Sequence, residues 1–137
     1  MAWHLLAMNI IGESPLIRQP ADDEFVTLGD RDSVRAQVSE SFPTTDWSDL
    51  TSGHFIAEDQ SYSLTFNVLP KEPFLALGID VRGGQESIPA LVKFAKSNGW
   101  QLFDCSGDWL DLDDPSTDGW QGYEKLRRSF SDSHGDA

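Results

Sequence analysis

An acidic, tryptophan-rich strip is the part of this sequence with the clearest chemical character. No Lys or Arg occurs between Ser97 and Glu124. The stretch instead combines carboxylates with large aromatic residues, which are Trp100, Asp104, Asp108, Trp109, Asp111, Asp113, Asp114, Asp118 and Trp120. Fixed anions beside aromatic anchors are typical of a surface that binds a basic protein. We therefore expect the partner-binding residues to be Asp104, Asp108, Trp109, Asp111, Asp113, Asp114, Asp118 and Trp120.

Metal-ligating residues are few in this chain and lie far apart. The three histidines, His4, His54 and His134, include no pair at metal-ligand spacing, and a single cysteine cannot build a thiolate zinc site. The aspartates that begin at Asp108 do not follow the EF-hand pattern, which needs a glycine at its sixth position and a glutamate at its twelfth. We expect no bound metal and no cofactor, although a zinc site that only the fold assembles stays open.

Two features that could support catalysis have simpler structural explanations. Cys105 lies beside Asp104 and Asp108, whose charges would raise its pKa, so we expect an inert, half-buried residue in a strand. The turn at residues 82–84 contains two glycines and could hold a phosphate between a strand and a helix, but the same glycines suit a tight turn. The sequence therefore predicts no catalytic residue.

Size and charge restrict the possible classes of protein. A chain of 137 residues with 39% hydrophobic residues can form a core, so we expect a single domain over 1–130 and a flexible tail over 131–137. One cysteine excludes an intramolecular disulfide, and no apolar run is long enough to span a membrane, which favours a cytoplasmic protein. The net charge of −13 would repel nucleic acids and anionic membranes and attract basic proteins.

Apolar patterns predict the strands. The clearest strand covers 62–68, where Tyr62, Leu64, Phe66 and Val68 alternate with polar residues. The run 74–81 is apolar on both faces, so we expect a central strand in a sheet whose second face is at least partly covered. The remaining predicted strands cover 3–11, 25–28, 54–57, 100–105 and 109–112, with turns at 58–60 and 106–107.

Two segments have the spacing of amphipathic helices. The first is capped by Asp30 or Asp32 and ends before Pro43, and its predicted buried face consists of Val34, Val38 and Phe42. The second is capped by Ser87 and ends at Gly99, and its predicted buried face consists of Ile88, Leu91, Val92 and Ala95. A third helix is predicted over 114–130.

Strands joined by short turns favour antiparallel pairing, and helices in separate blocks pack on a sheet face. We therefore predict an α+β fold with a mainly antiparallel sheet of five to six strands and two to three helices packed largely on one face. Trp3, Trp47 and Trp100 lie within or beside apolar runs and are predicted to be core residues. Trp109 and Trp120 have acidic neighbours and better suit an interface.

Several short motifs are similar to those of a group of small bacterial proteins. They are Phe42-Pro43 with Trp47, Ser63-Leu64-Thr65-Phe66-Asn67, Val81-Arg82-Gly83-Gly84, and Gly99-Trp100 followed by Asp104-Cys105-Ser106-Gly107 and Asp111-Leu112. On these motifs, within residues 30–112, the chain resembles immunity proteins that are encoded beside polymorphic or type VI secretion toxins. The resemblance implies an architecture and a toxin-binding role, and it brings no catalytic residues.

The leading hypothesis is an immunity protein without catalytic activity that binds a cognate toxin through the acidic and aromatic residues. Toxins that act on nucleic acids have basic clefts, which carboxylates can occupy in place of phosphates. The alternative is a nucleic-acid mimic of the anti-restriction or anti-CRISPR type. A small enzyme and an acidic domain without a strong partner also stay open, and a deep pocket with convergent polar residues would favour the enzyme.

Overall fold

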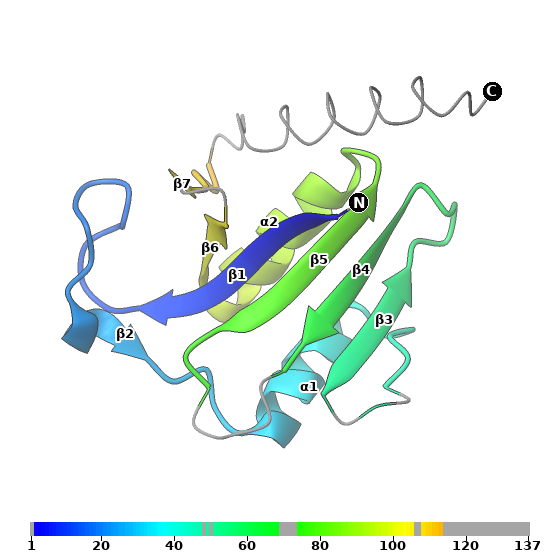
Figure 1. Ribbon diagram of the computed structural model, residues 1–137, viewed down its shortest axis with the longest axis horizontal. Coiled ribbons are helices and arrows are strands. Elements are labelled where there is room, and N and C mark those ends of the chain that lie inside the picture. The colour runs from blue at the N-terminus through cyan, green and yellow to red at the C-terminus, as the bar shows by residue number, and fades with distance from the viewer. Residues whose placement is uncertain (1, 48, 50, 69–73, 106–107, 114–137) are drawn as a thin grey trace.

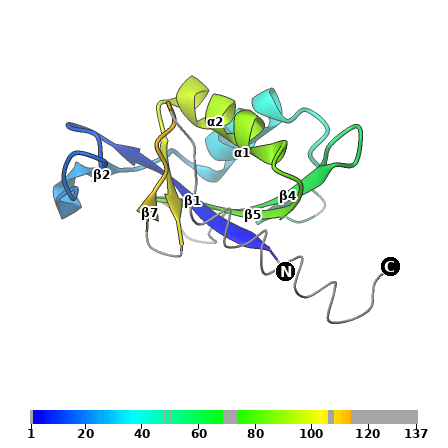
Figure 2. The same ribbon diagram turned by 90° about the horizontal axis from the view of Figure 1, so that it is seen from above.

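The computed structural model describes residues 2–47, 49, 51–68, 74–105 and 108–113. Two helices pack on one face of an antiparallel sheet (Figures 1 and 2), which confirms the predicted α+β class. The strands are β1 (Trp3–Ile10), β2 (Phe25–Val26), β3 (Ser52–Ile56), β4 (Tyr62–Asn67), β5 (Leu77–Gly83), β6 (Gln101–Asp104) and β7 (Asp108–Trp109). The helices are α1 (Arg31–Ser41) and α2 (Ser87–Asn98), and a short 3-10 helix, η1, spans Asp22–Glu24. The predicted helix over 114–130, the tail over 131–137 and the turn at 106–107 lie outside the described residues.

The strand order places the first strand of the chain in the middle of the sheet. The strands pair in the order β3-β4-β5-β1-β6-β7, and the short β2 pairs with the far end of β1. In the register of this sheet, Leu5 of β1 lies opposite Ile79 on one side and Asp104 on the other. Strands that are distant in the sequence are therefore neighbours at the centre, while β3 and β4 form a local hairpin.

The strand β5 is central, as predicted, but the prediction was wrong about its start. It begins at Leu77, because Phe74 is buried in the core and its carbonyl accepts a hydrogen bond from the backbone N–H of Leu28 (2.8 Å). On the side of β5 that faces away from the helices, the residues are Gly78, Asp80 and Arg82. This side of β5 therefore carries the charged residues Asp80 and Arg82, whereas apolar residues were predicted on both faces.

The helices begin and end where local chemistry requires it. An oxygen of Asp30 accepts a hydrogen bond from the backbone N–H of Ser33 (2.8 Å), which confirms the predicted cap of α1, and this bond lowers the pKa of Asp30. The predicted side-chain cap at Ser87 was wrong, since its hydroxyl donates to the carbonyl of Gly84 (3.1 Å). At the other end of α2, Gly99 has φ of 70°, the left-handed conformation that glycine adopts most easily.

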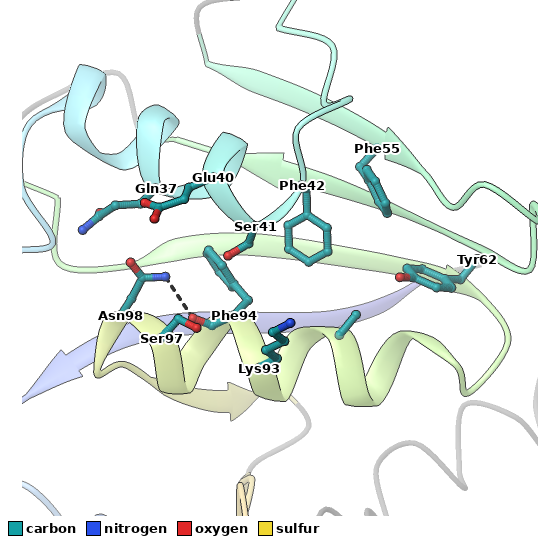
Figure 3. A pocket seen from close by; sticks show the side chains of 11 residues that line it. Gln37, Glu40, Ser41, Phe42, Phe55, Tyr62, Lys93, Phe94, Ser97 and Asn98 are labelled. Atoms are coloured by element: carbon teal, nitrogen blue, oxygen red, sulfur yellow. Dashed lines mark hydrogen bonds between the residues drawn. The ribbon is translucent and has the colours of Figure 1, made fainter.

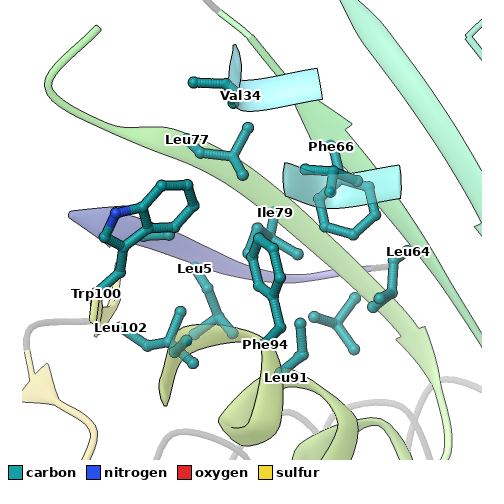
Figure 4. Packing of buried hydrophobic residues seen from close by; sticks show 14 of the residues in the cluster. Leu5, Val34, Leu64, Phe66, Leu77, Ile79, Leu91, Phe94, Trp100 and Leu102 are labelled. Carbon is teal, nitrogen blue, oxygen red and sulfur yellow. The ribbon is translucent and has the colours of Figure 1, made fainter. Parts of the chain in front are cut away.

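The core lies between the helices and the inward side of the sheet (Figure 4). Phe94 is at its centre and is fully buried, with ring centroids 5.6 Å from Phe42, 6.0 Å from Phe66 and 5.6 Å from Trp100. The predicted buried face of α2 omitted Phe94 and included Val92, which is only partly buried. The predictions that Trp3 and Trp100 belong to the core are confirmed, and Trp47 packs against it.

The sheet therefore has two unlike faces. We call the side under α1 and α2 the helix face, and the opposite side the open face. Alternation along the strands assigns Leu5, Ile79 and Leu102 to the helix face, where each is buried. The open face carries the side chains between them, which include His4, Leu6, Met8, Asp80, Arg82 and Phe103. None of the helices within the described ranges is long and apolar enough to cross a membrane.

Candidate protein-binding surface

Asp104 is the first of the predicted binding residues along the chain, and its side chain points inward. It ends β6 on the helix face, where it is only 3% exposed, and its carboxylate accepts a hydrogen bond from Nε1 of Trp3 (3.0 Å). A buried carboxylate of this kind ties β1 to β6 and cannot contact a partner. The sequence prediction that Asp104 belongs to a binding surface is corrected here, because strand alternation turns it toward the core.

Trp109 has the position that an interface residue needs. It is partly buried, and its ring packs edge-to-face on Phe103 with centroids 5.0 Å apart. On another side it stacks with Phe25 of β2 at 6.4 Å. We call Phe25, Phe103 and Trp109 the aromatic cluster. Its three rings come from three different strands, and each ring is partly exposed at the β7 edge of the sheet.

Asp111 and Asp113 are exposed, and both follow the end of β7, which is shorter than the strand predicted over 109–112. β7 ends at Trp109, and an oxygen of Asp111 accepts a hydrogen bond from the backbone N–H of Asp113 (3.0 Å), which closes a turn. Asp113 in turn pairs with Nζ of Lys96 on α2 at 2.8 Å. That hydrogen bond and the lysine charge lower the pKa of Asp113. Both carboxylates are thus exposed and make contacts within the molecule, Asp111 with the turn and Asp113 with Lys96.

The other predicted binding residues are only partly described. The backbone of Asp108 pairs with Asp104 in the β6–β7 ladder. Asp114, Asp118 and Trp120 lie outside the described residues. The structure therefore brings Trp109, Asp111 and Asp113 together at one edge of the sheet and removes Asp104 from that group.

Cys105 follows β6 and differs from the prediction in its exposure. It was expected to be half-buried but is exposed. Its backbone N–H donates to the carbonyl of His4 (3.1 Å), which places the thiol in the open-face row that contains His4 and Asp80. Partial burial raises the pKa of the Cys105 thiol, and the charges of Asp104 and Asp80 raise it further. The predicted direction of the pKa shift is confirmed, with Asp80 as a contributor that the sequence did not suggest.

A polar network covers the part of the open face that is farther from the aromatic cluster. Nδ1 of His4 lies 2.5 Å from an oxygen of Asp80, whose other oxygen accepts a hydrogen bond from the amide of Asn67 (3.3 Å). The hydroxyl of Ser52 donates to Asn67 (3.4 Å), so the network crosses four strands. A second chain of contacts on the same face joins His54, Thr65 and Arg82. These contacts cover the β3–β5 side of the open face with polar side chains.

A cavity of about 460 Å³ opens on the helix side, between α1, α2 and the β3–β4 hairpin (Figure 3). Aromatic rings of Phe42, Phe55, Tyr62 and Phe94 form its floor. Its ionisable lining residues are Glu40, Lys93 and Tyr62, and burial is the larger of the two effects that raise the pKa of Tyr62. Figure 3 shows Glu40 and Lys93 on different helices at opposite sides of the opening.

The sequence indicated only part of the aromatic cluster. Phe103 belongs to a strand that was predicted, and its alternation with Leu102 assigns it to the open face. Nothing in the sequence indicated Phe25 as a site residue, because its contact with Trp109 depends on the pairing of β2 with β1. Among the described residues, no group of three or more histidine, cysteine and acidic side chains could hold a metal ion.

Comparison with known proteins adds no assignment. No protein-family model matches this chain, and no curated protein sequence or solved structure matches it either.

Proposed function

We propose that this protein is a non-catalytic inhibitor of the immunity type that binds a basic bacterial toxin through the β6–β7 edge of its sheet. The observation that carries the proposal is the position of Trp109, half-buried between Phe103 and Phe25 with the exposed Asp111 two residues further on. Aromatic residues held in place by neighbouring rings are frequent energetic anchors of protein interfaces, because they bring large areas with little loss of side-chain freedom.

Charge supports a basic partner. The chain carries a net charge of −13, and its field would accelerate the approach of a positively charged surface at low salt. In the bound state, the exposed carboxylate of Asp111 can accept hydrogen bonds from a lysine or arginine of the toxin. Charge of this kind sets the association rate, while the aromatic cluster sets how long the complex lasts.

The test begins with the gene next to the one that encodes this chain. We expect its product to be toxic when expressed alone, and harmless when this protein is produced with it. Binding of the two purified proteins is then measured by biolayer interferometry. Trp109→Ala is expected to weaken binding about 30-fold, which corresponds to about 2 kcal/mol. The control is Ile56→Ala, which removes an exposed apolar side chain from β3 at the opposite edge of the sheet.

The charge part of the proposal has its own measurement. Asp111→Asn should slow association, and the effect should shrink as salt is raised from low to physiological ionic strength. Asp23→Asn, which removes an exposed carboxylate from η1, is the control. A neighbouring gene product that is not toxic, or that is not bound, contradicts the proposal. Tight binding instead to a DNA-binding restriction or CRISPR protein would favour the nucleic-acid mimic.

A further inference from the structure

The cavity between α1, α2 and the β3–β4 hairpin has a floor of aromatic rings (Figure 3). The four rings follow one another, with centroids 6.1 Å apart from Tyr62 to Phe55, 4.8 Å from Phe55 to Phe42 and 5.6 Å from Phe42 to Phe94. Phe42 and Phe94 are buried and hold the floor in place, whereas Phe55 and Tyr62 are partly exposed. A further ring can pack on these two in the offset or edge-to-face geometry that aromatic groups prefer.

Small side chains on the two helices leave the cavity unfilled. Ser41 on α1 and Ala90 and Ser97 on α2 line it, and their side chains are too short to occupy it. Its volume of about 460 Å³ is within the range of sites that bind small molecules. The lining residues come from residues 37–42, β3, β4 and α2, and from the connections next to these strands, so the cavity is separate from the aromatic cluster at the β7 edge.

Two charged groups of opposite sign flank the aromatic floor. Glu40 of α1 and Lys93 of α2 lie at opposite sides of the opening, and both side chains are exposed. Neither of them forms an ion pair with another residue that the structure describes. The carboxylate of Glu40 can accept hydrogen bonds from an ammonium group, and the ammonium group of Lys93 can donate to a carboxylate. A ligand that carries both groups would therefore have a partner on each side.

We propose that this cavity binds a small zwitterion with an aromatic body, which is the chemistry of a free aromatic α-amino acid. The ring of the ligand packs on Phe55 and Tyr62, its ammonium group faces Glu40 and its carboxylate faces Lys93. An uncharged aromatic molecule would leave both charged groups without a partner, and a zwitterion without a ring would leave the aromatic floor uncovered. The inference concerns a small-molecule site and does not depend on the proposed toxin.

The probe that tests this inference is L-phenylalanine, added to the ¹⁵N-labelled full-length chain and followed by two-dimensional NMR. We expect saturable shifts of the backbone amides of Phe55, Tyr62 and Lys93. Phenethylamine lacks the carboxylate and 3-phenylpropionate lacks the ammonium group. Each should bind about fivefold more weakly, since the lost contact is a solvent-exposed ion pair. Glycine, which has both charged groups but no ring, should cause no saturable shift.

Variants of the cavity complete the test. Glu40→Gln and Lys93→Gln should each weaken the binding of L-phenylalanine about fivefold, for the same reason. Their matched controls are Asp32→Asn on α1 and Lys96→Gln on α2, which remove exposed charges that do not line the cavity and should leave the affinity unchanged. Ala90→Leu places a larger side chain in the cavity and should abolish binding, and its circular dichroism spectrum checks that the variant is folded.

Three outcomes would overturn the inference. The first is that L-phenylalanine causes no saturable shifts at Phe55, Tyr62 and Lys93. The second is that a folded Ala90→Leu variant binds it as tightly as the wild type does. The third is that phenethylamine or 3-phenylpropionate binds as tightly as L-phenylalanine, because the paired charges would then have no role. No toxin is present in any of these measurements, so their outcome is independent of the proposed function.

Discussion

The two faces of the sheet show how one set of strands serves two purposes. On the helix face, most side chains are apolar and buried, as Leu5, Phe66 and Ile79 illustrate. On the open face, the same strands carry the polar network around Asp80 at β3–β5 and the aromatic cluster at β6–β7. Residues on the helix face therefore stabilise the fold. Residues on the open face are less restricted by packing, and the candidate binding surface lies among them.

The largest expected difference between the faces is in stability. Phe94→Ala removes a fully buried ring that contacts three other aromatic residues, and should lower the free energy of unfolding by about 3–5 kcal/mol. Phe103→Ala removes a partly exposed ring on the open face and should cost about 1 kcal/mol. Urea unfolding followed by circular dichroism measures both. Equal losses would show that the open face contributes to the core as much as the helix face does.

An intermediate effect is expected at the hydrogen bond between Trp3 and Asp104. Trp3→Phe keeps an aromatic ring but removes the Nε1 donor that the buried carboxylate accepts from, which should cost about 1–3 kcal/mol. The control is the same substitution on the open face, Trp109→Phe, which retains an aromatic ring beside Phe103 and should cost less than about 1 kcal/mol. If Trp3→Phe leaves the free energy of unfolding unchanged, Asp104 does not have the structural role assigned to it here.

The smallest expected effect concerns thiol reactivity on the open face. Because partial burial and, to a smaller extent, the charges of Asp104 and Asp80 raise the pKa of Cys105, less thiolate is present at pH 8, and Cys105 should react with a disulfide reagent more slowly than free cysteine does. Asp80→Asn should lower that pKa and increase the rate at pH 8 slightly, since Asp80 is the smallest of the three contributions and its charge is partly screened by solvent. Asp111→Asn is the control. A rate profile between pH 7 and 10 that is unchanged by Asp80→Asn would contradict this coupling.

Most of the fold could be predicted from the sequence, because the interactions that determine it are local. The cap at Asp30, the stop at Gly99 and the alternation of the strand 62–68 act within a few residues, and each is confirmed. The errors occurred where distant contacts decide. Phe74 is apolar and buried but does not pair as part of β5, because it contacts the segment before α1. Phe94 was omitted from the predicted buried face of α2, although three rings from other elements surround it.

The candidate surface was less predictable than the fold. The composition of the strip correctly indicated Trp109 as a residue that is not fully buried. It did not reveal that Asp104 points inward, because a shift of one position in a strand moves a side chain to the other face. It also did not reveal that Asp111 closes a turn with Asp113, since that choice depends on where the β6–β7 ladder ends.

The sequence by itself determined the class of fold, the ends of the helices and the strong negative charge, because these follow from composition and from interactions between near neighbours. Only the tertiary structure decided which carboxylates reach solvent and which rings gather at the β7 edge. The physical reason is that both depend on pairing between strands far apart in the chain. Leu5 lies opposite Asp104, and Phe25 reaches Trp109, only because β1 occupies the centre of the sheet.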